Sequence, residues 1–192
     1  MVVDVREELV NGLRAEHADQ ARMIAEPGTK LQLLETPFLG RTRLYEARKF
    51  LPTRPLLVYA GLQAGGTAVL LNGRPEAFDE LVRTDGARVA DAPTAAALVR
   101  TRQHVTRPQD HRYLIVDSLD AIPYRSGSTP DERLRSVVHP PLAQPAGAGF
   151  EVTLFVVEDE HLDLLTARVS PGGQVALSTQ TIASDLPLVY VL

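Results

Sequence analysis

The last third of the chain alternates apolar and polar residues with the period of a β-strand. The segments FEVTLFVV, HLDLLTARV and VALST follow one another between residues 150 and 179, separated only by EDE and SPGGQ. Linkers this short join neighbouring antiparallel strands. The sequence therefore predicts a three-strand antiparallel meander over residues 150–179. We expect valine at Gly172 or Gly173 to destabilise its second turn, because a β-branched residue resists positive φ.

The first half of the chain has the spacing of helices. Residues 4–26 repeat apolar positions with a helical period, and Pro27 and Gly28 then end the pattern. A short strand is expected in the segment that follows. The spacing of Leu44, Ala47 and Leu51 predicts a short helix that ends before Pro52.

The middle of the chain predicts two more helices and a strand. We expect helices over about 75–83 and 93–105, and a strand centred on Ile115. Residues 120–149 are rich in proline and glycine and are expected to be mostly irregular. They contain the capping box TPDE at 129–132, which predicts a short helix over about 130–138. The apolar tail from residue 184 is expected to pack against the protein.

Helices early and strands late indicate the α+β class. We expect N-terminal helices packed on a mainly antiparallel sheet, with the three-strand meander at the C-terminal end. A length of 192 residues suits a single domain, 1–192. Within it, residues 1–110 form the helix-rich half, residues 111–192 form the β-rich half, and the irregular loop spans about 120–149.

The composition of the chain argues against several classes of protein and of functional site. The chain has no cysteine, which excludes disulfides, thiolate nucleophiles and Cys-ligated metals. A net charge of −4 and a pI near 5.7 argue against a dedicated DNA-binding protein. No apolar run is long enough to span a membrane, and charges at Asp4 and Arg6 argue against a signal peptide. A cytoplasmic protein fits best. The abundance of arginine over lysine is typical of a GC-rich bacterial genome.

The stretch PLLVYAGLQAGGTAVLLNG, residues 55–73, has the outline of a phosphate-binding loop. Gly61 and Gly66 have the P-loop spacing, but Thr67 stands where the loop needs its lysine. The residues that follow are β-branched and apolar, so no helix N-terminus is available for phosphate. We therefore interpret Gly65 and Gly66 as the turn of a β-hairpin.

The remaining motifs give no firm catalytic site. Ser126 to Thr129 precede acidic residues, which favours a capped helix over an anion site. His104, Asp110 and His111 are close in the sequence, and His161 and Asp163 alternate on a predicted strand. Both patterns are also common in polar turns and strands. We predict neither a metal nor a cofactor.

Two arginine-rich stretches remain, at 41–54 and 100–112. Arginines mixed with aromatic residues are typical of contact surfaces, although an ordinary solvated surface is the simpler alternative. The candidate binding residues are Arg43, Tyr45, Arg48, Phe50, Arg102 and Arg107.

The sequence favours a non-catalytic binding or accessory module over an enzyme. Its expected partner is another protein or a second copy of the chain, with no membrane contact, and nucleic acid is the weaker alternative. The competing hypothesis is a small-ligand-binding protein or hydrolase-type enzyme. It would have a pocket between helices and sheet and use His104, Asp110 and His111.

Overall fold

The computed structural model describes residues 4–52, 55–107, 113–128 and 131–189. Two compact units divide these residues: unit 1 holds residues 4–87 and 105–107, and unit 2 holds residues 88–104 and 113–189. Each unit is built on one antiparallel sheet with helices. The predicted α+β class is therefore confirmed. The single-domain boundary stays a prediction, and the two units are described separately.

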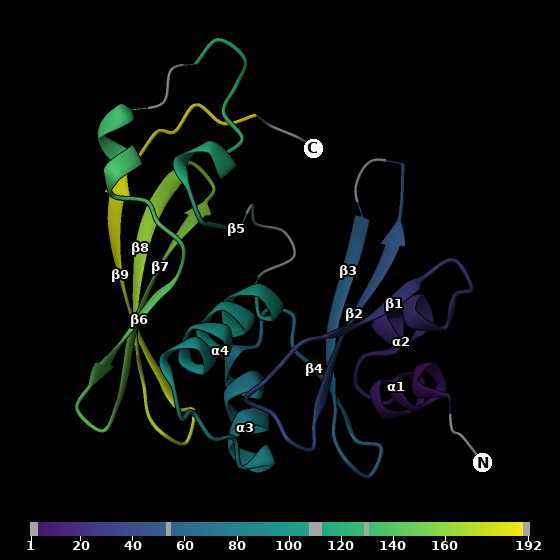
Figure 1. The fold of residues 1–192 in the computed structure, drawn as a ribbon. Helices are drawn as coiled ribbons and strands as arrows, with labels where there is room; N and C mark the ends of the chain where they lie inside the picture. The colour runs from purple at the N-terminus through teal and green to yellow at the C-terminus, as the bar shows by residue number, and fades with distance from the viewer. Residues whose placement is uncertain (1–3, 53–54, 108–112, 129–130, 190–192) are drawn as a thin grey trace. The chain divides into compact units, whose positions relative to one another are not determined.

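Unit 1 is built on a four-stranded antiparallel sheet, sheet A, with the order β1-β2-β3-β4 (Figure 1). The strands are β1 Lys30–Leu34, β2 Arg43–Phe50, β3 Pro55–Leu62 and β4 Ala68–Leu70. The turn between β3 and β4 contains Gly65 and Gly66, both with positive φ. The glycine-rich stretch is therefore a β-hairpin, as predicted, because its turn needs the backbone freedom of glycine.

Two short helices, α1 Val5–Leu13 and α2 Ala18–Ala25, cover one face of sheet A. Leu9, Leu13 and Ile24 are fully or almost fully buried in a core that includes strand residues of β2 and β3. Gly12 allows α1 to approach β4 closely, since an added Cβ would lie 2.6 Å from the Ala68 Cβ. The Arg6 guanidinium on α1 donates hydrogen bonds to the backbone oxygens of Ile24, Glu26 and Thr29, and so holds the C-terminal end of α2 and the segment after it. The strand residues of this core are Tyr45, Ala47, Val58, Ala60 and Leu62.

The opposite face of sheet A carries helix α3, Pro75–Asp85. Leu81 of this helix packs onto Gly61, where an added Cβ would collide with the leucine side chain. Phe78 contacts Phe38 edge to face, with 6.2 Å between the ring centroids. Sheet A is therefore covered on both faces where these helices lie.

Two predictions for unit 1 were wrong. Residues 43–50 form the strand β2 and not the helix predicted from Leu44, Ala47 and Leu51. Both faces of β2 are covered, so its apolar residues do not show the simple alternation that identifies a strand in a sequence. The helix expected over residues 4–26 is broken between Leu13 and Ala18 into α1 and α2. The break lets the two helices pack against each other and against the same sheet.

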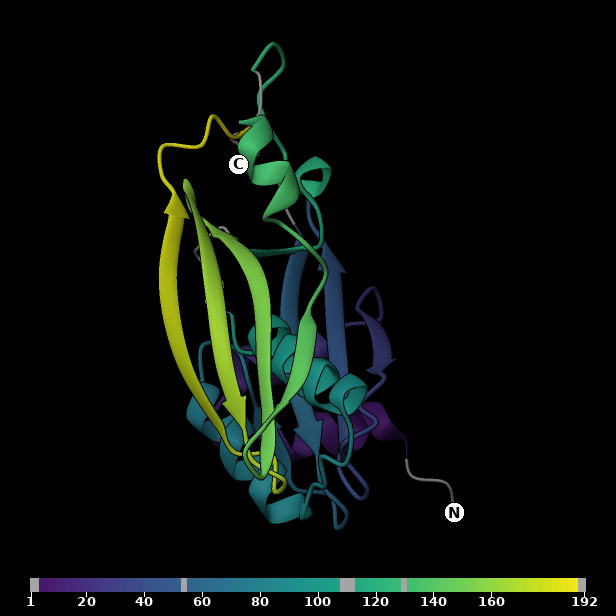
Figure 2. The same ribbon diagram turned by 60° about the vertical axis from the view of Figure 1, so that its left-hand side comes forward.

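Unit 2 is built on sheet B, in which β7 Gly149–Glu158, β8 His161–Val169 and β9 Val175–Ala183 pair in sequence. This is the predicted meander, with β9 as the outer strand (Figure 2). The other edge of β7 pairs with β5 Tyr113–Val116 along one half and with β6 Leu142–Ala146 along the other. The strand β6 was not predicted, because Pro145 is typical of irregular chain and is tolerated only at a sheet edge.

Helix α4, Ala92–Val105, is tied to sheet B near both of its ends. Before the helix, the Val89 N–H donates to the Pro171 oxygen in the β8–β9 turn at 2.9 Å. Toward its end, Gln103 accepts a hydrogen bond of 2.8 Å from the hydroxyl of Tyr113 on β5. Its last residue, Val105, belongs to unit 1.

One face of sheet B packs against two 3-10 helices, η1 Leu119–Ala121 and η2 Glu132–Ser136, and against the C-terminal tail. The tail packs as expected, with Leu186 and Leu188 buried. The helix expected at 130–138 is present as η2, and Asp131 caps it. Thr129, which begins the predicted capping box, lies outside the described residues. In the described residues, no helix is both long and apolar enough to cross a membrane.

Candidate functional site

A buried carboxylate lies on the same face of sheet A as Gly61, which Leu81 of α3 contacts. Glu46 on β2 is directly opposite Tyr59 on β3 in the antiparallel register. The Tyr59 hydroxyl donates to Glu46 Oε2 at 3.1 Å, and both residues are almost fully buried. Neighbouring Asn72 fixes the strand at this point, because its Oδ1 accepts the Tyr59 N–H at 2.7 Å.

Two arginines contact this pair, one on each residue. Arg48 lies two residues after Glu46 on the same face of β2, and its Nη2 is 2.6 Å from Glu46 Oε1. Arg107 donates from Nη2 to the Tyr59 hydroxyl at 2.8 Å, and its guanidinium carbon lies 5.5 Å from the centre of the Tyr59 ring. We call these four residues, Glu46, Arg48, Tyr59 and Arg107, the arginine cluster.

The electrostatics of the arginine cluster keep the tyrosine protonated. Burial raises the pKa of Tyr59 to about 12, with a smaller rise from the Glu46 carboxylate and an opposing effect of Arg107. Tyr59 is therefore a hydrogen-bonding phenol near neutral pH and not a base. Its role in the cluster is to hold Arg107 beside Glu46.

Apolar side chains extend the arginine cluster to the end of the β2–β3 hairpin. Phe50 is 60% exposed and Leu51 is 37% exposed, so two consecutive large apolar side chains reach the surface here. Lys30 on the neighbouring strand β1 holds its ammonium 5.5 Å from the centre of the Phe50 ring. Lys30 pairs with Arg48 in the register, so both cations project from the same face of the sheet. We call Lys30, Phe50 and Leu51 the hairpin tip.

The structure brings together three of the six predicted binding residues. Arg48, Phe50 and Arg107 lie on one face of sheet A, although 59 positions separate Arg48 from Arg107. Arg43 and Tyr45 project from the opposite face, where Tyr45 is buried in the core with α1 and α2. Arg102 lies in unit 2 and is only 8% exposed.

Sequence reasoning did not single out Glu46, Tyr59 or Lys30. Glu46 lies within the arginine-rich stretch 41–54, and Tyr59 lies within the apolar run that precedes Gly65. The pairing of Glu46 with Tyr59 depends on the register of the hairpin. A glutamate between Tyr45 and Arg48 in an apolar strand is the one signal that points to it.

The structure describes one of the three residues of the predicted His104, Asp110 and His111 group. His104 is half-buried near the end of α4, whereas Asp110 and His111 lie outside the described residues. His161 and Asp163 share a face of β8, but His161 is exposed and Asp163 is buried. In the described part of the chain, no three acidic or histidine side chains gather closely enough to hold a metal ion.

Unit 2 contains a second group of buried polar residues, next to α4. Burial raises the pKa of Tyr113, with further rises from Glu158 and Asp163 and an opposing effect of Arg102. No described residue donates a hydrogen bond to Asp163 Oδ1 or accepts one from Gln103 Nε2. These groups come from α4, β5, β7 and β8, and nothing among them forms a nucleophile and base pair.

A groove of about 670 Å³ lies at the turn end of sheet B and is open to solvent. The β6–β7 turn and the β8–β9 turn line it, with Phe150, Val169 and Pro171 as its larger apolar residues. Glu151 and Arg168 are its only charged lining residues. A groove of this chemistry offers few polar groups to orient a small molecule.

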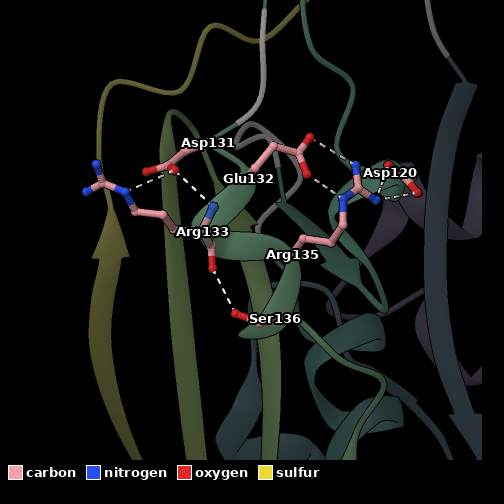
Figure 3. A network of polar contacts seen from close by, with 6 residues as sticks. All are labelled: Asp120, Asp131, Glu132, Arg133, Arg135 and Ser136. Carbon is pink, nitrogen blue, oxygen red and sulfur yellow. Dashed lines mark hydrogen bonds and ion pairs between the residues drawn. The ribbon is translucent and has the colours of Figure 1, made fainter.

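An exposed ion-pair network joins η1 to η2 (Figure 3). Arg135 contacts Asp120 at 3.0 Å and Glu132 at 2.7 Å. Hydrogen bonds to these two carboxylates raise the pKa of Arg135 and, in turn, lower the pKa of Glu132. Because two carboxylates already neutralise Arg135, this arginine connects the two helices rather than offering its charge to a ligand.

Comparison with protein-family models, curated proteins and solved structures finds no match to this chain. Of the sites described, the arginine cluster with the hairpin tip combines cations with large exposed apolar side chains.

Proposed function

We propose that the protein is a non-catalytic binding module that recognises an acidic, partly apolar segment of another protein. The observation that carries this proposal is the hairpin tip, where exposed Phe50 and Leu51 stand beside Lys30. Aromatic residues and arginine are enriched at protein interfaces, and this surface combines exposed Phe50 with Arg48.

Charge supports an acidic partner. Lys30, Arg48 and Arg107 supply three positive charges on this face, and Glu46 supplies one negative charge. The excess of positive charge contrasts with a net charge of −4 for the whole chain. A negatively charged segment would therefore be steered to this face.

A protein segment fits this surface better than nucleic acid does. Single-stranded nucleic acid binds by stacking bases on exposed aromatic rings. Tyr59 is fully buried, which leaves Phe50 as the exposed ring of this surface. The apolar pair Phe50 and Leu51 would instead bury leucine-like side chains of a peptide.

The test uses fluorescence anisotropy with a labelled peptide of alternating glutamate and leucine, over a salt series. We expect the double variant K30E/F50A to weaken binding about tenfold or more, because it removes a cation and an anchor. The effect should shrink as salt rises.

A matched control is available on the opposite face of the same strands. R43E/L33A makes the same change in charge and also removes one exposed large side chain, since Leu33 is 55% exposed. This variant should bind like the parent. Equal losses in both variants, or no binding of the peptide by the parent, would contradict the proposal. Tighter binding of a labelled single-stranded oligothymidine would support the nucleic-acid alternative.

A further inference from the structure

The outer strand of sheet B has an unblocked edge. β9 pairs with β8 along its length, and no strand in the described part of the chain pairs with its other side. Residues 176–181 are all exposed. An edge strand of this kind presents alternate N–H and C=O groups that can pair with another strand.

The composition of β9 lacks the usual protection of an edge. Its sequence, VALSTQTIA, contains no charged residue, proline or glycine. The whole segment from Val169 to Ser184 is uncharged, in a chain of which 23% is charged. Its one register shift lies at the far end, opposite Leu162 and Asp163, so seven residues remain regular.

The other sheet edges are protected. On the opposite edge of sheet B, β5 has four residues and β6 contains Pro145. In sheet A, the outer strands are β4, with three residues, and β1, with five residues beginning at Lys30. Short length, proline and lysine are the devices that prevent pairing between edges. β9 alone, among the described edges, has none of them over most of its length.

We propose that β9 is a self-association edge, which pairs antiparallel with β9 of a second copy of this chain to form a two-fold dimer. A two-fold axis near Thr179 places the same short segment of both copies face to face. A charged strand would repel itself in this arrangement, whereas an uncharged one does not. The segment therefore suits its own copy, and gives an acidic or basic partner no charge to recognise.

The dimer should be weak. Pairing two nine-residue strands adds main-chain hydrogen bonds but buries little area, and small interfaces are typical of transient association. Leu177, which is 38% exposed, adds some apolar contact. We expect the parent to be monomeric at about 10 µM and substantially dimeric at about 500 µM in sedimentation velocity.

The test places lysines on the edge. S178K/Q180K adds two exposed cations on one face of β9, and self-pairing would bring four of them together. We expect this variant to stay monomeric at the higher concentration. The matched control is Q144K/A146K, which adds two exposed lysines with the same spacing on β6, at the opposite edge of sheet B. It should dimerise like the parent.

Amide hydrogen exchange of the parent gives a second readout that needs no variant. Raising the concentration should slow exchange at alternate residues of 175–183 and leave β6 unchanged. A parent that stays monomeric at about 500 µM would overturn the proposal, as would a dimer unaffected by S178K/Q180K or without protection in β9. The hairpin tip plays no part here, so K30E/F50A should leave the dimer intact, and the two proposals fail separately.

Discussion

The Asp85 carboxylate, at the end of α3, holds the segment that leads into β2. Its oxygens accept the backbone N–H groups of Gly40, Arg41 and Thr42 at 2.7, 2.9 and 2.5 Å. Burial by itself would raise the pKa of Asp85, but these hydrogen bonds to the charged form outweigh it and lower the pKa. One side chain therefore positions the start of the strand that carries the arginine cluster.

This carboxylate should make stability depend on pH. Its pKa is lower in the folded protein than in the unfolded chain, so its contribution is present above about pH 4 and is lost as pH falls through the folded value. We expect D85N to cost about 1.5–3 kcal/mol of unfolding free energy at pH 7, measured by urea titration. The difference between parent and D85N should narrow below about pH 4. A difference that stays constant down to pH 3 would show that charge plays no part.

For single residues, the sequence alone could propose which arginines bind a partner, but not which of them are exposed. Arg48, Phe50 and Arg107 were predicted as binding residues, yet Arg102 of the same pattern is buried in the other unit. What separates them is burial, which depends on packing between distant segments. The N–H of Gly73 donates to the Thr106 oxygen at 3.1 Å, and this contact places Arg107 beside sheet A. Nothing in the local sequence indicates it.

Among the elements, strands joined by short connections were the easiest to predict. The meander β7–β8–β9 has short connections and clear alternation, and its prediction is confirmed. β2 was mistaken for a helix because Leu44 and Ala47 are buried on opposite faces, and because Glu46 is buried as well. When both faces of a strand are covered, burial no longer follows polarity, and the period of two is lost.

The β8–β9 turn distinguishes two adjacent glycines. Gly173 has a φ of 78°, whereas Gly172 has no positive φ. The destabilisation expected from valine at either glycine is therefore expected at Gly173 alone. We expect G173V to destabilise the protein by about 1–3 kcal/mol, because valine is strained in the left-handed region. G172V is the matched control and should have a much smaller effect. Thermal melts that fall equally for the two variants would show that the strain at Gly173 is not the cause.

For the whole molecule, the question is whether the two units unfold together. Helix α4 belongs to unit 2 up to His104, and the chain then enters unit 1 at Val105. Arg107 follows directly and donates to Tyr59 in the arginine cluster. If unit 2 melted, α4 would unfold, and Val105 and Arg107 would lose the helix that precedes them in the chain. The covalent continuity of α4 therefore favours a single cooperative domain, as the length of the chain predicts.

We expect differential scanning calorimetry to give one transition, with equal calorimetric and van't Hoff enthalpies. G173V changes only unit 2 and D85N changes only unit 1, so the pair tests the coupling. In a single domain, each substitution shifts the whole transition, by about 2–4 °C for each kcal/mol lost. Two resolved transitions, with each variant lowering only one of them, would show two domains. In that case, peptide binding measured at a temperature between the two transitions would show whether the arginine cluster persists when sheet B is unfolded.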